Sequence, residues 1–201
     1  RALMTPTVYS HHVARIAKAM LRRASARLLA ETPTDAGTLR RMDDAELLVT
    51  LRSTDATAEM GRRLTYRDLY KRVVWAERSA VPAALLDCTP EEIRDHEREI
   101  ADAASVDPAA VIVDVPDEPS MAESSSRVLI NGTVRRLEEQ STLVRALQTA
   151  QRERWRLGVY APEDARERVG DAAVRTLGLD IDGSRVSDTP QGIHATLDEF
   201  E

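Results

Sequence analysis

The residues best suited to chemistry lie near the start of the chain, where Tyr9, His11, His12 and Arg15 occur within seven positions. On a helix this spacing places Tyr9 and His12 on one face, and His11 and Arg15 on another. Either pair could contact a phosphate or a sugar, although spacing alone favours capping or packing roles for all four. Adjacent histidines point about 100° apart on a helix, so His11 and His12 do not form a metal-binding pair.

A second group of cations occupies residues 66–72, where Arg67, Lys71 and Arg72 lie within six positions. Such a group could bind a nucleotide phosphate through charge-assisted hydrogen bonds. The alternative is a salt-bridge cluster around Asp68 at a junction between two parts of the chain. The spacing of the residues does not separate these two interpretations.

Other chemistries have no support in the sequence. It contains no glycine-rich phosphate loop and no Gly-x-Ser-x-Gly motif, and the acidic residues near its end do not fit a calcium-binding loop. Cys88 is the single cysteine, which excludes an internal disulfide and is typical of a reducing cytoplasm. No apolar run is long enough to cross a membrane, so we expect a cytoplasmic chain without a membrane partner.

Charge is unevenly distributed along the 201 residues, whose formal net charge is −6. Residues 1–72 carry 14 Lys and Arg against 8 Asp and Glu, whereas residues 73–179 and 180–201 are both acidic. The basic first third could attract phosphate-bearing ligands or acidic partner surfaces, or it could be a solvated or interface-forming face.

The first third of the chain is predicted to be helical. Apolar residues with a 3.6-residue period predict a long amphipathic helix that ends near Glu31. A loop should follow over residues 32–37, and Asp43 with Glu46 has the pattern of a capping box for the next helix. A third helix is predicted from Ala56 to Leu64, with Asp55 as its cap.

From residue 70 onward the pattern alternates between strands and helices. Predicted strands, helices and a hairpin at Asn131-Gly132 follow one another in the order strand, helix, strand, hairpin, helix, strand. That order is typical of a ferredoxin-like module. We therefore predict an α+β fold with a helical domain over residues 1–68, an α+β module over residues 69–178 and an acidic flexible tail over residues 179–201.

Taken together, these segments resemble a known family. The run Val8-Tyr9-Ser10-His11-His12-Val13, the helix after it, Met42-Asp43-Asp44 and Tyr66-Arg67-Asp68-Leu69-Tyr70-Lys71 are similar to HD-domain phosphohydrolases. The resemblance is strongest to the SAM-and-HD-domain deoxynucleoside triphosphate triphosphohydrolases and their archaeal and bacterial relatives. It implies that residues 1–68 are the helical end of an HD-type core.

The resemblance also implies roles for individual residues. It assigns Tyr9 to the substrate sugar, His11 to nucleotide contacts, and Arg67 and Lys71 to a regulatory nucleotide site. The position after His11 is a Lys in the regulated vertebrate member of the family and is His12 here. We also expect His12 and Arg15 to contact the nucleotide, because each shares a helix face with one of these residues. The family uses a divalent metal of the Mn, Mg or Fe type, held by His and Asp ligands that precede the Tyr-x-His segment. Those ligands have no counterpart in this sequence.

We therefore expect a portion of a nucleotide phosphohydrolase that binds no metal itself and is inactive alone. Its expected partners are a nucleotide substrate, a missing N-terminal half and further copies of itself. A non-catalytic regulatory or assembly module is the alternative, and a nucleic-acid binder using the basic first third is the less favoured third interpretation.

Overall fold

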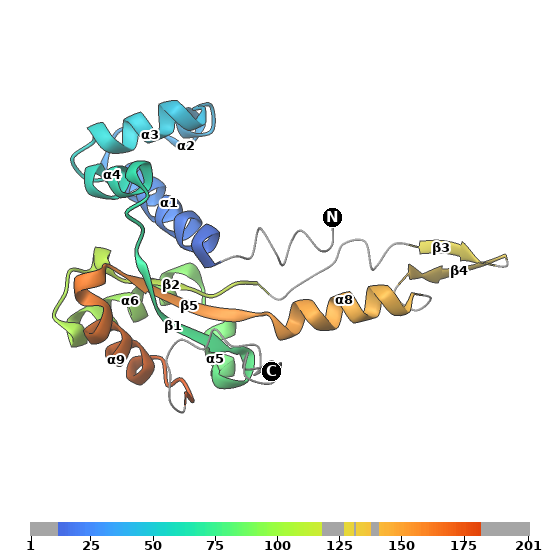
Figure 1. Cartoon of the computed structure of the whole chain (residues 1–201). Coiled ribbons are helices and arrows are strands. Elements are labelled where there is room, and N and C mark those ends of the chain that lie inside the picture. The colour runs from blue at the N-terminus through green and yellow to red at the C-terminus, as the bar shows by residue number, and fades with distance from the viewer. Residues whose placement is uncertain (1–11, 118–126, 131, 138–140, 182–201) are drawn as a thin grey trace, which may run out of the picture.

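The computed structural model describes residues 12–117, 127–130, 132–137 and 141–181, and it confirms the predicted α+β class. A group of helices lies at one end of the molecule, against a small antiparallel sheet that carries further helices on its other side (Figure 1). Tyr9, His11 and the acidic residues from 182 onward lie outside the described residues.

The helical part begins with α1 (His12–Glu31), whose apolar stripe buries Ile16, Met20, Ala24 and Leu28. These four positions recur every four residues, so they lie along one face of the helix. The remaining helices of this part are α2 (Ala36–Leu39), α3 (Asp44–Ser53) and α4 (Ala58–Tyr66).

One predicted helix cap in this part is correct and another is wrong. Asp43 and Glu46 form the predicted capping box at α3. The predicted cap at Asp55 is wrong, because α4 begins two residues later, after Thr57, whose buried hydroxyl donates to the Leu51 carbonyl at 2.8 Å. The predicted loop over residues 32–37 is interrupted by α2, which Asp35 caps by accepting from the Thr38 amide.

The second part is built on three antiparallel strands in the order β1-β5-β2. The strands are β1 (Lys71–Glu77), β2 (Ile112–Asp114) and β5 (Arg156–Ala161). The main helices of this part are α5 (Ala83–Leu86), α6 (Pro90–Ala104) and α9 (Arg166–Thr176), with single 3-10 turns at Arg78–Ala80, Pro108–Ala110 and Glu163–Ala165. Thr89 and Glu92 form a second capping box, at the start of α6.

The remaining elements stand apart from this sheet. Strands β3 (Arg127–Ile130) and β4 (Thr133–Arg136) pair only with each other, and α8 (Thr142–Glu153) leads from them back to β5. A ferredoxin-like module would combine all of its strands in one sheet. The predicted order of elements along the chain is therefore present, but the described strands form two separate sheets.

Two clusters of buried side chains hold the molecule together. The larger lies between the sheet, α6 and α9, and includes Ile100, Leu157 and Val169. The smaller joins the helical part to the opposite face of the sheet, because it combines residues of α1, α3 and α4 with Tyr70, Ile112 and Tyr160. Among the described residues, no helix is both long enough and apolar enough to span a membrane.

Candidate functional site

A cleft of about 370 Å³ opens where the first turn of α1, the α4–β1 junction and the start of α9 meet. Four of the side chains that line it are cationic, and we call this the cationic cleft. Its lining residues are His12, Val13, Ile16, Arg67, Leu69, Tyr70, Lys71, Arg72 and Arg166. None of these nine residues is acidic, so the walls favour an anionic ligand.

The α4–β1 junction brings three of the cations to the cleft through an unusual backbone conformation. Arg67 ends α4 with φ 58° and ψ 26°, in the left-handed region, and its amide donates to the carbonyls of Arg63 and Leu64. Such a left-handed residue closes a helix and reverses the chain, a role that glycine usually fills. The turn directs the chain into β1, whose first residues are Lys71 and Arg72.

Asp68 does not neutralise this group of cations. Its Oδ2 atom accepts from Arg63 Nη1 at 2.8 Å, on the helix side of the junction. Arg63 also pairs with Glu59 at 3.1 Å and lies over the Tyr70 ring at 5.6 Å. The acidic residue that could have formed a salt-bridge cluster with Arg67, Lys71 and Arg72 therefore has its described ion pair with a different arginine.

Glu163 lies near two of the cations that line the cleft. It lies 3.9 Å from Lys71 Nζ and 3.7 Å from Arg166 Nη1. Its side chain is 64% exposed, and those of Lys71 and Arg166 are 46% and 47% exposed. Exposed ion pairs at such distances contribute little. Both cations can therefore turn toward an anion in the cleft at small cost.

Arg15 lies behind this cleft rather than in its lining. Its Nε and Nη2 atoms donate to Asp114 Oδ2 at 2.9 and 2.6 Å, and its Nη1 donates to the Arg156 carbonyl at 2.9 Å. The guanidinium also lies 4.6 Å from the centroid of Trp75, which Arg72 approaches at 5.2 Å. Arg15 thus links α1 to β1, β2 and β5.

Tyr160 completes the environment of Asp114. Its hydroxyl donates to Asp114 Oδ2 at 2.9 Å. Burial, and then the negative charge of Asp114, raise the pKa of Tyr160 well above its ordinary value, so the hydroxyl remains a donor. Asp114 therefore receives bonds from a cation and a neutral hydroxyl, and its charge is compensated within the fold.

The structure brings together three of the residues that the sequence predicted for a site. His12, Arg67 and Lys71 line one cleft, although Arg67 and Lys71 are more than fifty positions from His12. Arg166 also lines this cleft and was missed, because nothing in the sequence around the start of α9 connects it to the residues of the first third.

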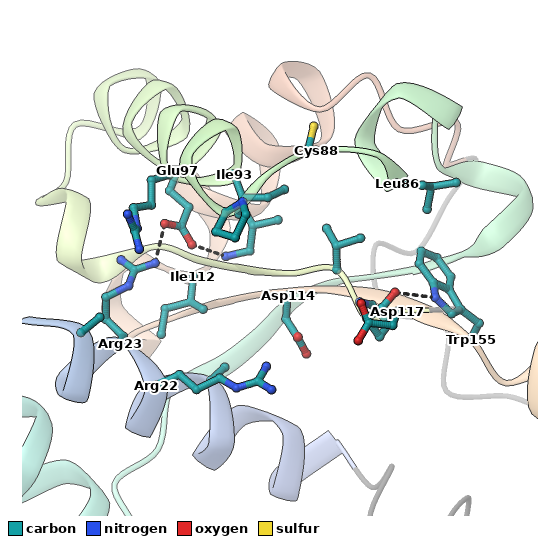
Figure 2. Close-up of a pocket in the computed structure, with 17 residues that line it drawn as sticks. Arg22, Arg23, Leu86, Cys88, Ile93, Glu97, Ile112, Asp114, Asp117 and Trp155 are labelled. Atoms are coloured by element: carbon teal, nitrogen blue, oxygen red, sulfur yellow. Dashed lines mark hydrogen bonds and ion pairs between the residues drawn. The ribbon is translucent and has the colours of Figure 1, made fainter. Parts of the chain in front are cut away.

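A second cleft, of about 480 Å³, lies between α1, α6 and the end of β2 (Figure 2). Arg23 reaches across it from α1 to Glu97 on α6, and Glu97 also accepts from the Val113 amide at 2.9 Å. Its lining mixes arginines with Glu97, Asp114 and Asp117. Its charges largely compensate one another, so it suits an anion less well than the cationic cleft.

A resident metal does not fit the described part of the chain. No group of three or more His, Cys, Asp or Glu side chains is placed to hold an ion within residues 12–117, 127–130, 132–137 and 141–181. Metals of the expected type need several such ligands around one point.

The fold and the cleft define an α+β chain whose helical part packs on a small sheet, with cations gathered where the two parts meet. Residues 1–188 match the family described as the HD associated region. The chain belongs to this family, which associates it with HD-domain proteins.

Two similar proteins are both longer than this chain. An uncharacterized protein of Methanocaldococcus jannaschii is 26% identical over 168 residues, which cover 82% of this chain and 36% of that protein. The crystal structure of a hypothetical protein from Aquifex aeolicus has a TM-score of 0.54 and 18% identity, covering 85% of this chain and 42% of that one. The chain thus spans less than half of either relative, and the second similarity concerns the fold alone.

Proposed function

We propose that the chain is the nucleotide-contacting portion of an HD-superfamily phosphohydrolase, and that the cationic cleft binds the phosphates of a nucleotide. A deoxynucleoside triphosphate is the leading choice of ligand, because the sequence resembles that branch of HD enzymes. Membership of the HD associated region family supports the general connection to HD-domain proteins.

The observation that carries this proposal is the convergence of Arg67, Lys71, Arg72 and Arg166 on one cleft without an acidic lining residue. Arginine supplies planar, bidentate donors that match phosphate oxygens, and lysine supplies a mobile point charge. The rings of His12 and Tyr70 also line the cleft and offer a less polar surface against which a base or a sugar can pack. Three separate segments of the chain are needed to form this arrangement.

In this proposal the chain supplies substrate contacts, and the chemistry belongs to a longer protein. The divalent metal of the parent enzyme would activate water for attack on phosphorus. Residues outside this chain would hold that metal. Purified residues 1–201 should accordingly release no phosphate from dGTP with Mn²⁺ or Mg²⁺; hydrolysis that EDTA abolishes would contradict this division of roles.

Equilibrium binding of dGTP to the 201-residue chain tests the cleft directly. Lys71→Ala and Arg166→Ala should each weaken binding about tenfold, because each removes a charge-assisted phosphate contact. The binding of the unmodified chain should also weaken as salt is raised. Isothermal titration calorimetry measures both effects.

Arg52→Ala is the matched control, because Arg52 is an exposed arginine of α3 outside the cleft. This variant should bind dGTP as the unmodified chain does, and circular dichroism should show all variants folded. If the control loses as much affinity as the cleft variants, binding is a general charge effect. If folded chain shows no affinity for dGTP, the cleft is not a nucleotide site.

A further inference from the structure

The hairpin β3–β4 and helix α8 extend together away from the three-stranded sheet (Figure 1). We call these three elements the arm. All four residues of β4 are exposed, and α8 has no buried residue. An isolated two-stranded hairpin is marginally stable in water unless another surface covers it. The exposure of the arm therefore points to a partner.

Part of the surface of the arm is apolar. Leu129, Val134 and Leu143 are 72%, 59% and 69% exposed, and they are among the most exposed large apolar side chains of the described chain. Leu129 and Val134 are directly paired across the hairpin, so they lie on the same face. Burying these apolar side chains against a protein surface would be favourable, whereas a charged nucleic-acid backbone offers them no apolar contact.

The arm differs in charge from the rest of the chain. Residues 127–154 contain six arginines and three glutamates, a net charge of +3, whereas residues 73–126 and 155–179 together contain seven arginines and 17 acidic residues, a net charge of −10. The side chains of Arg127, Arg135 and Arg145 form no ion pair with any described carboxylate. The sheet-and-helix part of a second copy thus offers a surface of complementary charge.

The charge also decides how two copies can associate. Two basic arms repel each other, so pairing arm with arm is disfavoured. In a two-fold dimer each arm can instead lie on the body of its partner, and the same contact then forms twice.

The described helix whose charge best complements the basic arm is α6. This helix contains six acidic residues and two arginines, and Glu91, Asp95, Glu99 and Asp102 are exposed at intervals of four, four and three positions. That spacing places them along one side of the helix. Asp95 already pairs with Arg98, and Glu99 lies 3.4 Å from His96, which leaves Glu91 and Asp102 as the acids most able to meet another charge.

We propose that two copies of this chain form a dimer by exchanging arms, with the basic, apolar arm of each copy docked against the acidic side of α6 in the other. This contact is independent of the nucleotide cleft. Sedimentation equilibrium of residues 1–201 between about 1 and 100 µM should show a dimer that salt weakens.

Reversing the charges on either the arm or α6 should raise the dimer dissociation constant by roughly tenfold or more, because close charge pairs across an interface contribute to affinity. The arm variant is Arg127→Glu with Arg145→Glu, and the α6 variant is Glu91→Arg with Asp102→Arg. Mixing the two variants should restore association, because each reversed surface meets its reversed complement. Leu129→Ser with Leu143→Ser should also weaken the dimer without changing charge.

The control is Arg52→Glu with Arg62→Glu, which makes the same charge change at exposed positions of α3 and α4. It should leave the dimer intact, and circular dichroism should show every variant folded. A monomer at all concentrations, or a dimer indifferent to either reversal, would overturn the proposal. The proposal would also be overturned if the chain were a monomer that binds DNA or RNA and lost this binding when the arm arginines were replaced.

Discussion

At the scale of single residues, Arg15 is a cation predicted for substrate contact that also serves the fold. Its guanidinium donates to the Asp114 carboxylate and the Arg156 carbonyl and stacks on Trp75. Arginine is suited to this role because its planar group offers several donors and an apolar face. By fixing α1 against the sheet, Arg15 also fixes the position of His12 at the cationic cleft. Its predicted direct contact with nucleotide stays a prediction.

Asp114→Ala should lower the free energy of unfolding by about 2–4 kcal/mol, because it leaves the Arg15 guanidinium and the Tyr160 hydroxyl without their acceptor in a mostly buried site. Urea denaturation followed by circular dichroism measures this loss. Asp117→Ala removes an exposed carboxylate three residues away and should change stability little. Equal effects from both variants would show that the network does not stabilise the fold.

Glu97 gives the fold a predictable response to pH. Desolvation raises the pKa of this buried carboxyl, although Arg23 and the Val113 amide partly oppose the shift. The folded state therefore binds a proton more readily than the unfolded state, so the contribution of Glu97 is most favourable below the unfolded pKa. Stability is then lost as pH rises from that value through the raised folded value.

Urea denaturation between about pH 4 and pH 7 tests this sign. The unmodified chain should lose stability relative to Glu97→Gln as the pH rises across that interval. Asp102→Asn, which removes an exposed carboxylate from the same helix, is the control for loss of a surface charge. The opposite trend for Glu97→Gln would mean that Arg23 dominates and that the pKa is lowered.

At the scale of elements, helix caps separate two aspartates that look equivalent in the sequence. Asp43 accepts from the Glu46 amide at 2.8 Å, whereas Asp55 lies outside α4 and does not cap it. Asp43→Ala should therefore cost about 1 kcal/mol of stability, and Asp55→Ala should cost much less. Thermal unfolding of the two variants compares them directly, and similar losses would contradict this assignment.

The packing of α3 on α4 depends on Gly61. A Cβ atom at this position would lie 2.7 Å from the backbone carbon of Leu51 and 2.8 Å from the Arg52 nitrogen. Because backbone atoms cannot rotate away, Gly61→Ala should destabilise the chain by about 1–3 kcal/mol despite alanine's better helix propensity. Arg62→Ala, at the next and exposed position, should be nearly neutral in the same denaturation experiment.

At the scale of the whole molecule, the helical part and the sheet should unfold together. The smaller core cluster combines Met20 and Leu28 of α1 with Ile112 and Tyr160 of the sheet, so separating the two parts would expose this shared cluster. Tryptophan fluorescence and far-ultraviolet circular dichroism should therefore give one coincident urea transition. Separate midpoints would show that the two parts are independent folding units.

Local patterns in the sequence predicted many of the elements. The period of α1 and the capping box at α3 both depend on neighbours within a few positions. The start of α4 was misplaced because the choice between Asp55 and Thr57 depends on a buried bond from the Thr57 hydroxyl to Leu51. The separation of β3–β4 from the main sheet was missed because strand partners are not encoded by local alternation of side chains.

The sequence by itself determined the α+β class, the end of α1, the capped start of α3, and the presence of cations at residues 66–72. Only the tertiary structure decided which charges meet. It placed Arg166 beside Lys71, paired Asp68 with Arg63, and joined Arg15 to Asp114 across 99 positions of chain. The physical reason is range: helix periodicity and capping act over a few residues, whereas charge pairing and clefts require surfaces that only long-range packing brings together.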